Sequence, residues 1–132
     1  MDISKKYIEM CERAMEIQVL WRPHMADWYY NKIGHIDWVR VDRHPTGKHL
    51  DDLDIDYNEE INFIWLPRQD QLQEIVGSSS YNTFYELVQE MTMYEFLDSW
   101  KPVKDEDSIE MIWLHYVMLK KYNKTWHDEN WV

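Results

Sequence analysis

The stretch that decides the fold is Trp28–Val41, with the sequence WYYNKIGHIDWVRV. Both ends are rich in aromatic and β-branched residues, which favour strands, and Gly34 lies between them. This arrangement predicts a β-hairpin with strands at about 27–32 and 36–41. Farther along the chain, the run Ile61-Asn62-Phe63-Ile64-Trp65 has the same character and predicts a third strand at 61–65.

Helical periodicity precedes this stretch. Apolar side chains recur with the spacing of one helix face from about residue 3 to residue 20, with Cys11 on the apolar line and Met15 and Val19 beside it. The pattern predicts one amphipathic helix. Pro23 is expected to end it, because the residue before a proline is pushed out of the helical region.

Helical patterns return at Pro67. They predict a short helix that Gly77 ends, a second helix over about 84–94, and a third whose N-cap is Asp107, three residues before Glu110. Because the strands and most of the helices occupy different parts of the sequence, we predict an α+β fold, a small antiparallel sheet of about three strands covered by about four helices. A chain of 132 residues is expected to form a single domain, residues 1–132.

The charge is strongly acidic and unevenly placed. The chain has 25 Asp and Glu against 14 Lys and Arg, a net charge of −11. Residues 42–60 carry a net −5 and residues 86–110 a net −6, so the whole excess lies in these two stretches. We predict a polar acidic loop at about 42–60. Both stretches are interpreted either as solvated surface or as an acidic patch that meets a basic partner or mimics a nucleic-acid backbone. Direct nucleic-acid binding is not expected without a basic stripe.

Several classes of protein are excluded by simple counts. Cys11 is the only cysteine, which excludes an internal disulfide framework or a multi-cysteine zinc site and suits a reducing compartment. No apolar run approaches the roughly 18 residues that span a bilayer. The first residues lack the apolar core of a signal peptide. We therefore expect a cytoplasmic protein without a membrane partner.

No pattern for catalysis, metal or cofactor binding emerges. The acidic run at 51–60 resembles a calcium loop only in part: with Asp52 at the first position, Tyr57 stands where the loop needs glycine and Phe63 where it needs glutamate. None of the six histidines forms a zinc-helix pair, and the three glycines lie too far apart to cradle a phosphate. We therefore name no catalytic residue, no metal ligand and no cofactor.

The segment from Trp65 to Glu74 is the best candidate for a binding surface, because it places glutamines, an arginine and an aspartate at a helix start. The alternative is that these are ordinary helix-start residues. The candidate partner-binding residues are Arg68, Gln69, Asp70 and Gln73. We expect the first three to be exposed, and we expect the turn to be held by the buried side chains of Trp65, Leu72 and Val76.

The polar tail 125–131 carries two tryptophans, Trp126 and Trp131, with few apolar neighbours in sequence. Because tryptophan is costly to leave in water, two interpretations stay open. These side chains either pack back on their own chain or fill the interface of a homodimer.

Three segments together resemble a group of small bacteriophage and prophage proteins. They are Glu16–Pro23, the turn from Trp65 to Glu74, and Ile112–Trp126 with the closing Trp131. The resemblance covers most of the chain, with 42–60 as its variable part. It implies a setting, the cytoplasm of a bacterial host cell, and carries over no catalytic residue.

Two functions follow as hypotheses. The first is a non-enzymatic phage-type accessory protein that acts by binding another protein, whose identity the sequence does not give. The alternative is a hydrolase or nucleic-acid-processing enzyme with an acidic, metal-dependent site in the 42–60 loop. The lack of a nucleophile, metal or cofactor pattern favours the first.

Overall fold

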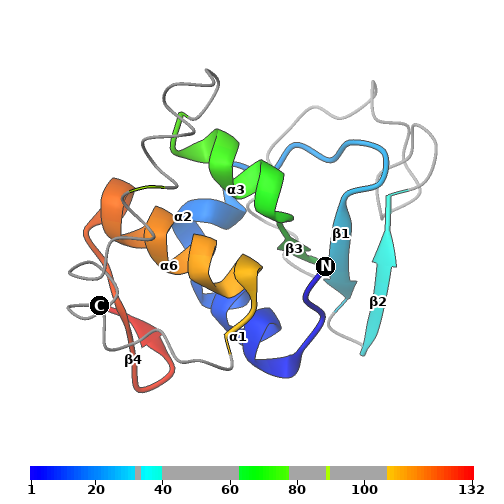
Figure 1. The fold of residues 1–132 in the computed structure, drawn as a ribbon. Coiled ribbons are helices and arrows are strands. Elements are labelled where there is room, and N and C mark those ends of the chain that lie inside the picture. The colour runs from blue at the N-terminus through cyan, green and yellow to red at the C-terminus, as the bar shows by residue number, and fades with distance from the viewer. Residues whose placement is uncertain (32–33, 40–62, 78–88, 90–106) are drawn as a thin grey trace. The chain divides into compact units, whose positions relative to one another are not determined.

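The computed structural model describes residues 1–31, 34–39, 63–77, 89 and 107–132, and Figure 1 shows its helices and strands. The chain divides into two compact units, which we call the sheet unit (Ile3–Pro67) and the helix unit (Met1–Asp2 with Arg68–Val132). The described residues form four helices, a three-stranded antiparallel sheet and a two-stranded sheet. The predicted α+β class is confirmed. The single domain stays a prediction. The predicted acidic loop at 42–60 lies outside the described residues, and so does the predicted helix at 84–94 except for residue 89, which is helical.

The three-stranded sheet belongs to the sheet unit. Its central strand β1 (Trp28–Asn31) pairs antiparallel with β2 (His35–Trp38) on one side and with β3 (Phe63–Leu66) on the other. The predicted hairpin is confirmed. Gly34 adopts a φ of 107°, which L-residues rarely adopt, and the Asn31 side chain accepts a hydrogen bond from the backbone N–H of His35 at 2.9 Å. β2 ends at Trp38, before the predicted end at 41, and residues 40–41 are not described.

Aromatic rings form the core of the sheet unit. The indole of Trp21 stacks on that of Trp65, with ring centroids 6.3 Å apart and planes inclined by 4°, and it lies 6.3 Å from the ring of Tyr29. Phe63 meets Tyr29 edge-on at 5.5 Å. The indole N–H of Trp21 donates to the buried carboxylate of Asp27 at 3.0 Å, so the one polar atom of this ring is satisfied. These contacts fix the segment that follows the N-terminal helices against the sheet.

The single helix predicted for residues 3–20 is wrong. The structure has two helices, α1 (Lys5–Arg13) and α2 (Met15–Gln18), separated at the buried Ala14, whose ψ of 65° is not helical. The N–H of Ala14 donates to the carbonyl of Cys11 at 3.1 Å, and the same carbonyl accepts from the side chain of Gln18 at 3.0 Å. The backbone groups at the break therefore have hydrogen-bonding partners. The spacing of apolar residues in the sequence gives no sign of these bonds. α2 also ends before Pro23, so the proline is not what stops it.

The helix unit contains α3 (Gln69–Ile75) and α6 (Ile109–Tyr122), which pack against each other. The predicted N-cap of α6 was one residue too early. Ser108 is the cap, and its hydroxyl accepts from the N–H of Met111 at 3.1 Å. Asp107 instead lies in the interior, with a carboxylate oxygen 3.9 Å from Nε2 of His115. α6 ends at Asn123, which adopts the left-handed conformation with φ 55°.

The C-terminal tail forms a small hairpin that the sequence pattern did not predict. Its strands are β4 (Trp126–His127) and β5 (Asn130–Trp131), joined through Asp128 and Glu129, which have φ values of 47° and 61°. Trp131 is buried, with its ring 5.0 Å from that of Trp126 and 5.4 Å from that of His115. Trp131 thus packs back on its own unit, as one of the two interpretations expects. A homodimer stays a prediction.

Candidate partner-binding surface

The residues predicted to bind a partner lie at the start of α3. Arg68 precedes the helix, and its N–H donates to the side-chain oxygen of Gln71 at 2.9 Å. The N–H of Leu72 donates to the carbonyl of Arg68 at 3.0 Å, which closes the first helical turn. The Leu72 side chain is fully buried. A local cap and one apolar anchor therefore fix the direction in which this turn presents its polar side chains.

The burial of the segment follows the prediction in part. Trp65 and Leu72 are buried and Asp70 is exposed, as expected. Three further residues differ from the expected burial and are half-buried: Arg68 and Gln69, which were expected to be exposed, and Val76, which was expected to be buried. The last of these residues is the C-cap of α3, which ends at Ile75.

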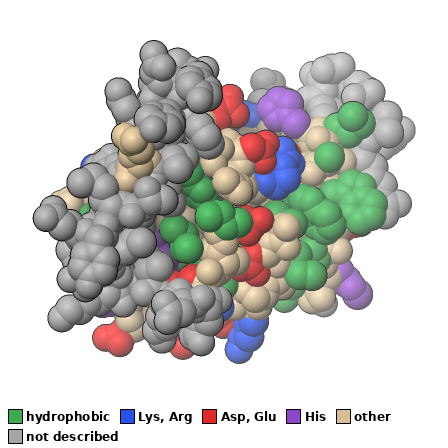
Figure 2. All heavy atoms as spheres, viewed as in Figure 1, with side chains coloured by type: hydrophobic (Ala, Val, Ile, Leu, Met, Phe, Trp, Pro, Cys, Tyr) green, Lys and Arg blue, Asp and Glu red, His purple; other side chains and the backbone are tan. Residues whose placement is uncertain are grey.

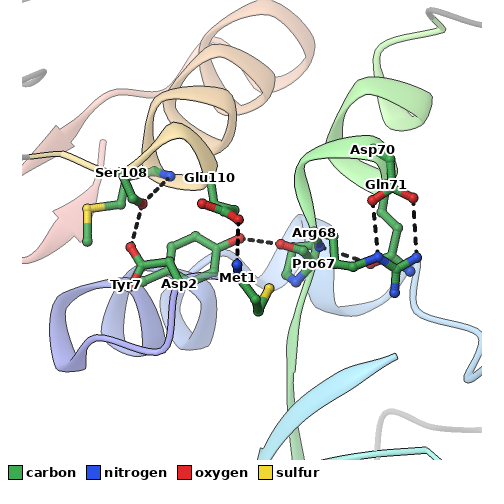
Figure 3. A network of polar contacts seen from close by, with 10 residues as sticks. Met1, Asp2, Tyr7, Pro67, Arg68, Asp70, Gln71, Ser108 and Glu110 are labelled. Carbon is green, nitrogen blue, oxygen red and sulfur yellow. Dashed lines mark hydrogen bonds and ion pairs between the residues drawn. The ribbon is translucent and has the colours of Figure 1, made fainter. Parts of the chain in front are cut away.

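The outer face of this turn is polar and acidic. The guanidinium of Arg68 forms two hydrogen bonds with the carboxylate of Asp70, from Nε at 3.1 Å and from a terminal nitrogen at 3.2 Å (Figure 3). This pairing neutralises one acid and holds both side chains in one orientation. Glu74 is exposed and stands four residues after Asp70, on the same face of the helix. Gln73, between them in sequence, is half-buried.

The acidic face of α3 is defined here by Asp70 and Glu74. The prediction from sequence named the first and missed the second. The i, i+4 spacing on an expected helix was the signal that could have identified Glu74.

A second set of exposed side chains lies on α2 and just after it. Met15 and Val19, predicted to belong to the apolar face of the first helix, have exposed fractions of 45% and 43%, and Leu20 has 41%. The N–H of Val19 donates to the carbonyl of Met15 at 3.1 Å, so the two side chains lie one turn apart. The break at Ala14 explains the difference, because it rotates the second helix away from the face that the first one buries.

Several titratable groups of the helix unit form ion pairs or hydrogen bonds within that unit. The N-terminal amine of Met1 lies 3.4 Å from the carboxylate of Glu110, and Asp2 shares a hydrogen bond with Ser108 at the start of α6 (Figure 3). His115 is fully buried, and its Nε2 lies 3.9 Å from a carboxylate oxygen of Asp107. Among the residues that the structure describes, no three His, Cys, Asp or Glu side chains gather as metal ligands.

Charged side chains on the face drawn in Figure 2 are mixed. Among the described residues of that face, Lys and Arg side chains stand apart from one another, with acidic and apolar side chains between them. This distribution provides no continuous basic stripe on the described part of that face.

Comparison of the chain with protein-family models, curated proteins and solved structures finds no match to any of them. Within the described ranges, no helix is long and apolar enough to cross a membrane.

Proposed function

We propose that the protein is a non-enzymatic accessory protein that binds another protein through the acidic face of α3, and that its partner presents a basic surface there. The observation that carries this proposal is the exposure of Asp70 and Glu74 on one face of a helix anchored by the buried Leu72. Charged groups held on a rigid element bind with less loss of conformational entropy than groups on a mobile loop.

The charge of the whole chain supports the same proposal. At a net charge of −11, long-range attraction favours encounters with basic surfaces and disfavours acidic ones. The guanidinium of Arg68 offsets the charge of Asp70, to which it is hydrogen-bonded, so the net acidity of the face comes from Glu74 and from the charge of the whole chain. The half-buried Gln69 beside this face supplies an amide group that can donate and accept hydrogen bonds at the edge of such an interface, whereas the amide nitrogen of Gln73 is buried.

The biological setting that we propose is that of a phage or prophage protein in a bacterial host cell. The support for it is the resemblance of the segments around Trp21, Arg68 and Trp113 to small phage and prophage proteins. The partner is accordingly sought among host proteins with basic surfaces.

The test is capture from bacterial lysate by immobilised protein at low and moderate salt, followed by titration of the purified partner. The variant Asp70→Lys/Glu74→Lys should bind that partner about tenfold more weakly or worse, and the wild-type affinity should fall as salt rises. The control Asp128→Lys/Glu129→Lys makes the same charge change at exposed residues of the C-terminal hairpin and should leave binding within about twofold. Lack of a specific partner at both salt concentrations, or equal losses in both variants, would overturn the proposal.

A further inference from the structure

The outer edge of β3 is closed by side chains rather than by a strand. In the described sheet the strand order is β2-β1-β3, so β3 pairs with β1 along one edge only. The other edge of such a strand carries backbone N–H and C=O groups that can pair with a strand of another molecule. The hydrogen-bonding partners of these backbone groups therefore show how the chain avoids that pairing.

Gln18 satisfies both backbone groups of Trp65. The N–H of Trp65 donates to the side-chain oxygen of Gln18 at 2.8 Å, and the side-chain nitrogen of Gln18 donates to the carbonyl of Trp65 at 3.0 Å. A neighbouring antiparallel strand makes this same reciprocal pair of bonds at every second residue. The carboxamide thus occupies the place of one strand residue.

The second N–H of the same amide reaches back to the break between α1 and α2. It donates to the carbonyl of Cys11 at 3.0 Å. Only one orientation of the amide suits all three contacts, because its nitrogen must face the two carbonyls and its oxygen the N–H of Trp65. The non-helical backbone at Ala14 directs α2 so that one side chain bonds both the end of α1 and the edge of β3.

Tyr7 closes the next outward position of the same edge. Its hydroxyl, fully buried, donates to the carbonyl of Pro67 at 2.6 Å (Figure 3). Pro67 has no N–H to offer. At Trp65 and Pro67, the backbone groups that point toward this edge are therefore bonded to a side chain, except for the N–H that proline lacks.

The sequence that contains β3 has the composition of a self-pairing segment. Residues 61–66 have the sequence INFIWL, without charge, proline or glycine and with high β-propensity. Two copies of one strand pair naturally about a two-fold axis, since an antiparallel arrangement brings the same edge of each copy together. A second copy of this chain is thus the partner that this edge would fit once the side chains of Gln18 and Tyr7 no longer close it.

We propose that Gln18, supported by Tyr7, is an edge lock that keeps β3 from pairing with β3 of a second copy. Opening the lock converts the chain to a form that self-associates through residues 63–66. The inference does not depend on the acidic face of α3, and its experiment needs no partner protein.

The experiment uses the full chain and Gln18→Met, which keeps the side-chain length but removes every hydrogen bond of the amide. Light scattering from micromolar to near-millimolar protein should show self-association at a concentration at least about tenfold lower than for the wild type. Hydrogen exchange should place the new protection at residues 63–66. The control Glu12→Ala, at an exposed site on α1, should behave as the wild type.

Tyr7→Phe provides a second variant that loses one hydrogen bond only, so it should shift self-association in the same direction by a smaller factor. Circular dichroism identifies the variants that fold. The proposal is overturned when every folded variant keeps the mass of the wild type over the whole range, or when association protects a region other than β3.

Discussion

The N-terminal helices and α6 have similar sequence patterns but different structures. Both show apolar residues at helical spacing over more than three turns. α6 runs for 14 residues from Ser108, which caps it, to Asn123, which ends it in the left-handed conformation. The N-terminal pattern instead divides at Ala14, where neither a proline nor a glycine stands.

The difference shows that two kinds of signal set the boundaries of a helix. At α6 the signals are local: a serine side chain within reach of a free N–H, and an asparagine that tolerates a positive φ. At Ala14 the groups that compensate for the lost helical bonds include the side chain of Gln18, which is itself held by Trp65 from another part of the sequence. A contact over 47 positions cannot be read from a local pattern.

The largest expected effect tests how far α6 depends on packing in addition to its caps. Leu72 on α3 is fully buried, and α3 packs on α6. Leu72→Ala should lower the free energy of unfolding by about 2–5 kcal/mol, because it removes apolar contact and leaves a cavity. Urea unfolding measures this loss. A loss smaller than that of Ser108→Ala would mean that the caps dominate the stability of this unit.

The next effect tests the tertiary origin of the break at Ala14. Gln18→Ala should destabilise the chain by about 1–3 kcal/mol, since it leaves buried backbone groups of Trp65 and Cys11 without their partner. Hydrogen exchange of the Trp65 amide should accelerate in the monomeric variant. If stability and exchange are both unchanged, the break is set by local backbone preference, and the contrast with α6 disappears.

Removal of the α6 cap should have a smaller effect. Ser108→Ala deletes the hydroxyl that accepts from the N–H of Met111, at a cost of about 1 kcal/mol. Ser108→Asp keeps an acceptor at the cap but places a second carboxylate beside Asp2, so it should recover only part of that loss. Thermal unfolding of both variants against the wild type tests this order.

The smallest effect is expected at the acidic face of α3 and beside it. Arg68→Ala and Gln69→Ala should each change the free energy of unfolding by no more than about 0.5 kcal/mol, because the Arg68–Asp70 ion pair is partly exposed, with side-chain exposures of 35% and 68%, and Gln69 is only half-buried. Losses comparable with that of Leu72→Ala in urea unfolding would place these residues in a structural network. The candidate binding surface would then be lost.

Much of the fold was predictable because its signals are local. Aromatic and β-branched runs around Gly34 predicted the hairpin, and the third strand and α6 followed from composition and spacing. Of the candidate site, the sequence identified the helix start at Arg68 and the anchor Leu72, but not Glu74 as part of the exposed acidic face. The C-terminal hairpin was missed because Asp128 and Glu129 do not form one of the glycine-containing turns that mark a hairpin.

The sequence by itself therefore determined the three-stranded sheet, the helices α3 and α6, the acidic charge, and the turn that presents Asp70. Only the tertiary structure decided that the N-terminal pattern breaks at Ala14, that Met15 and Val19 face outward, and that Gln18 covers the edge of β3. The physical reason is the distance in sequence over which each kind of interaction acts. Periodicity and caps act within a few residues, whereas a buried backbone group accepts any partner that the fold brings within hydrogen-bond distance.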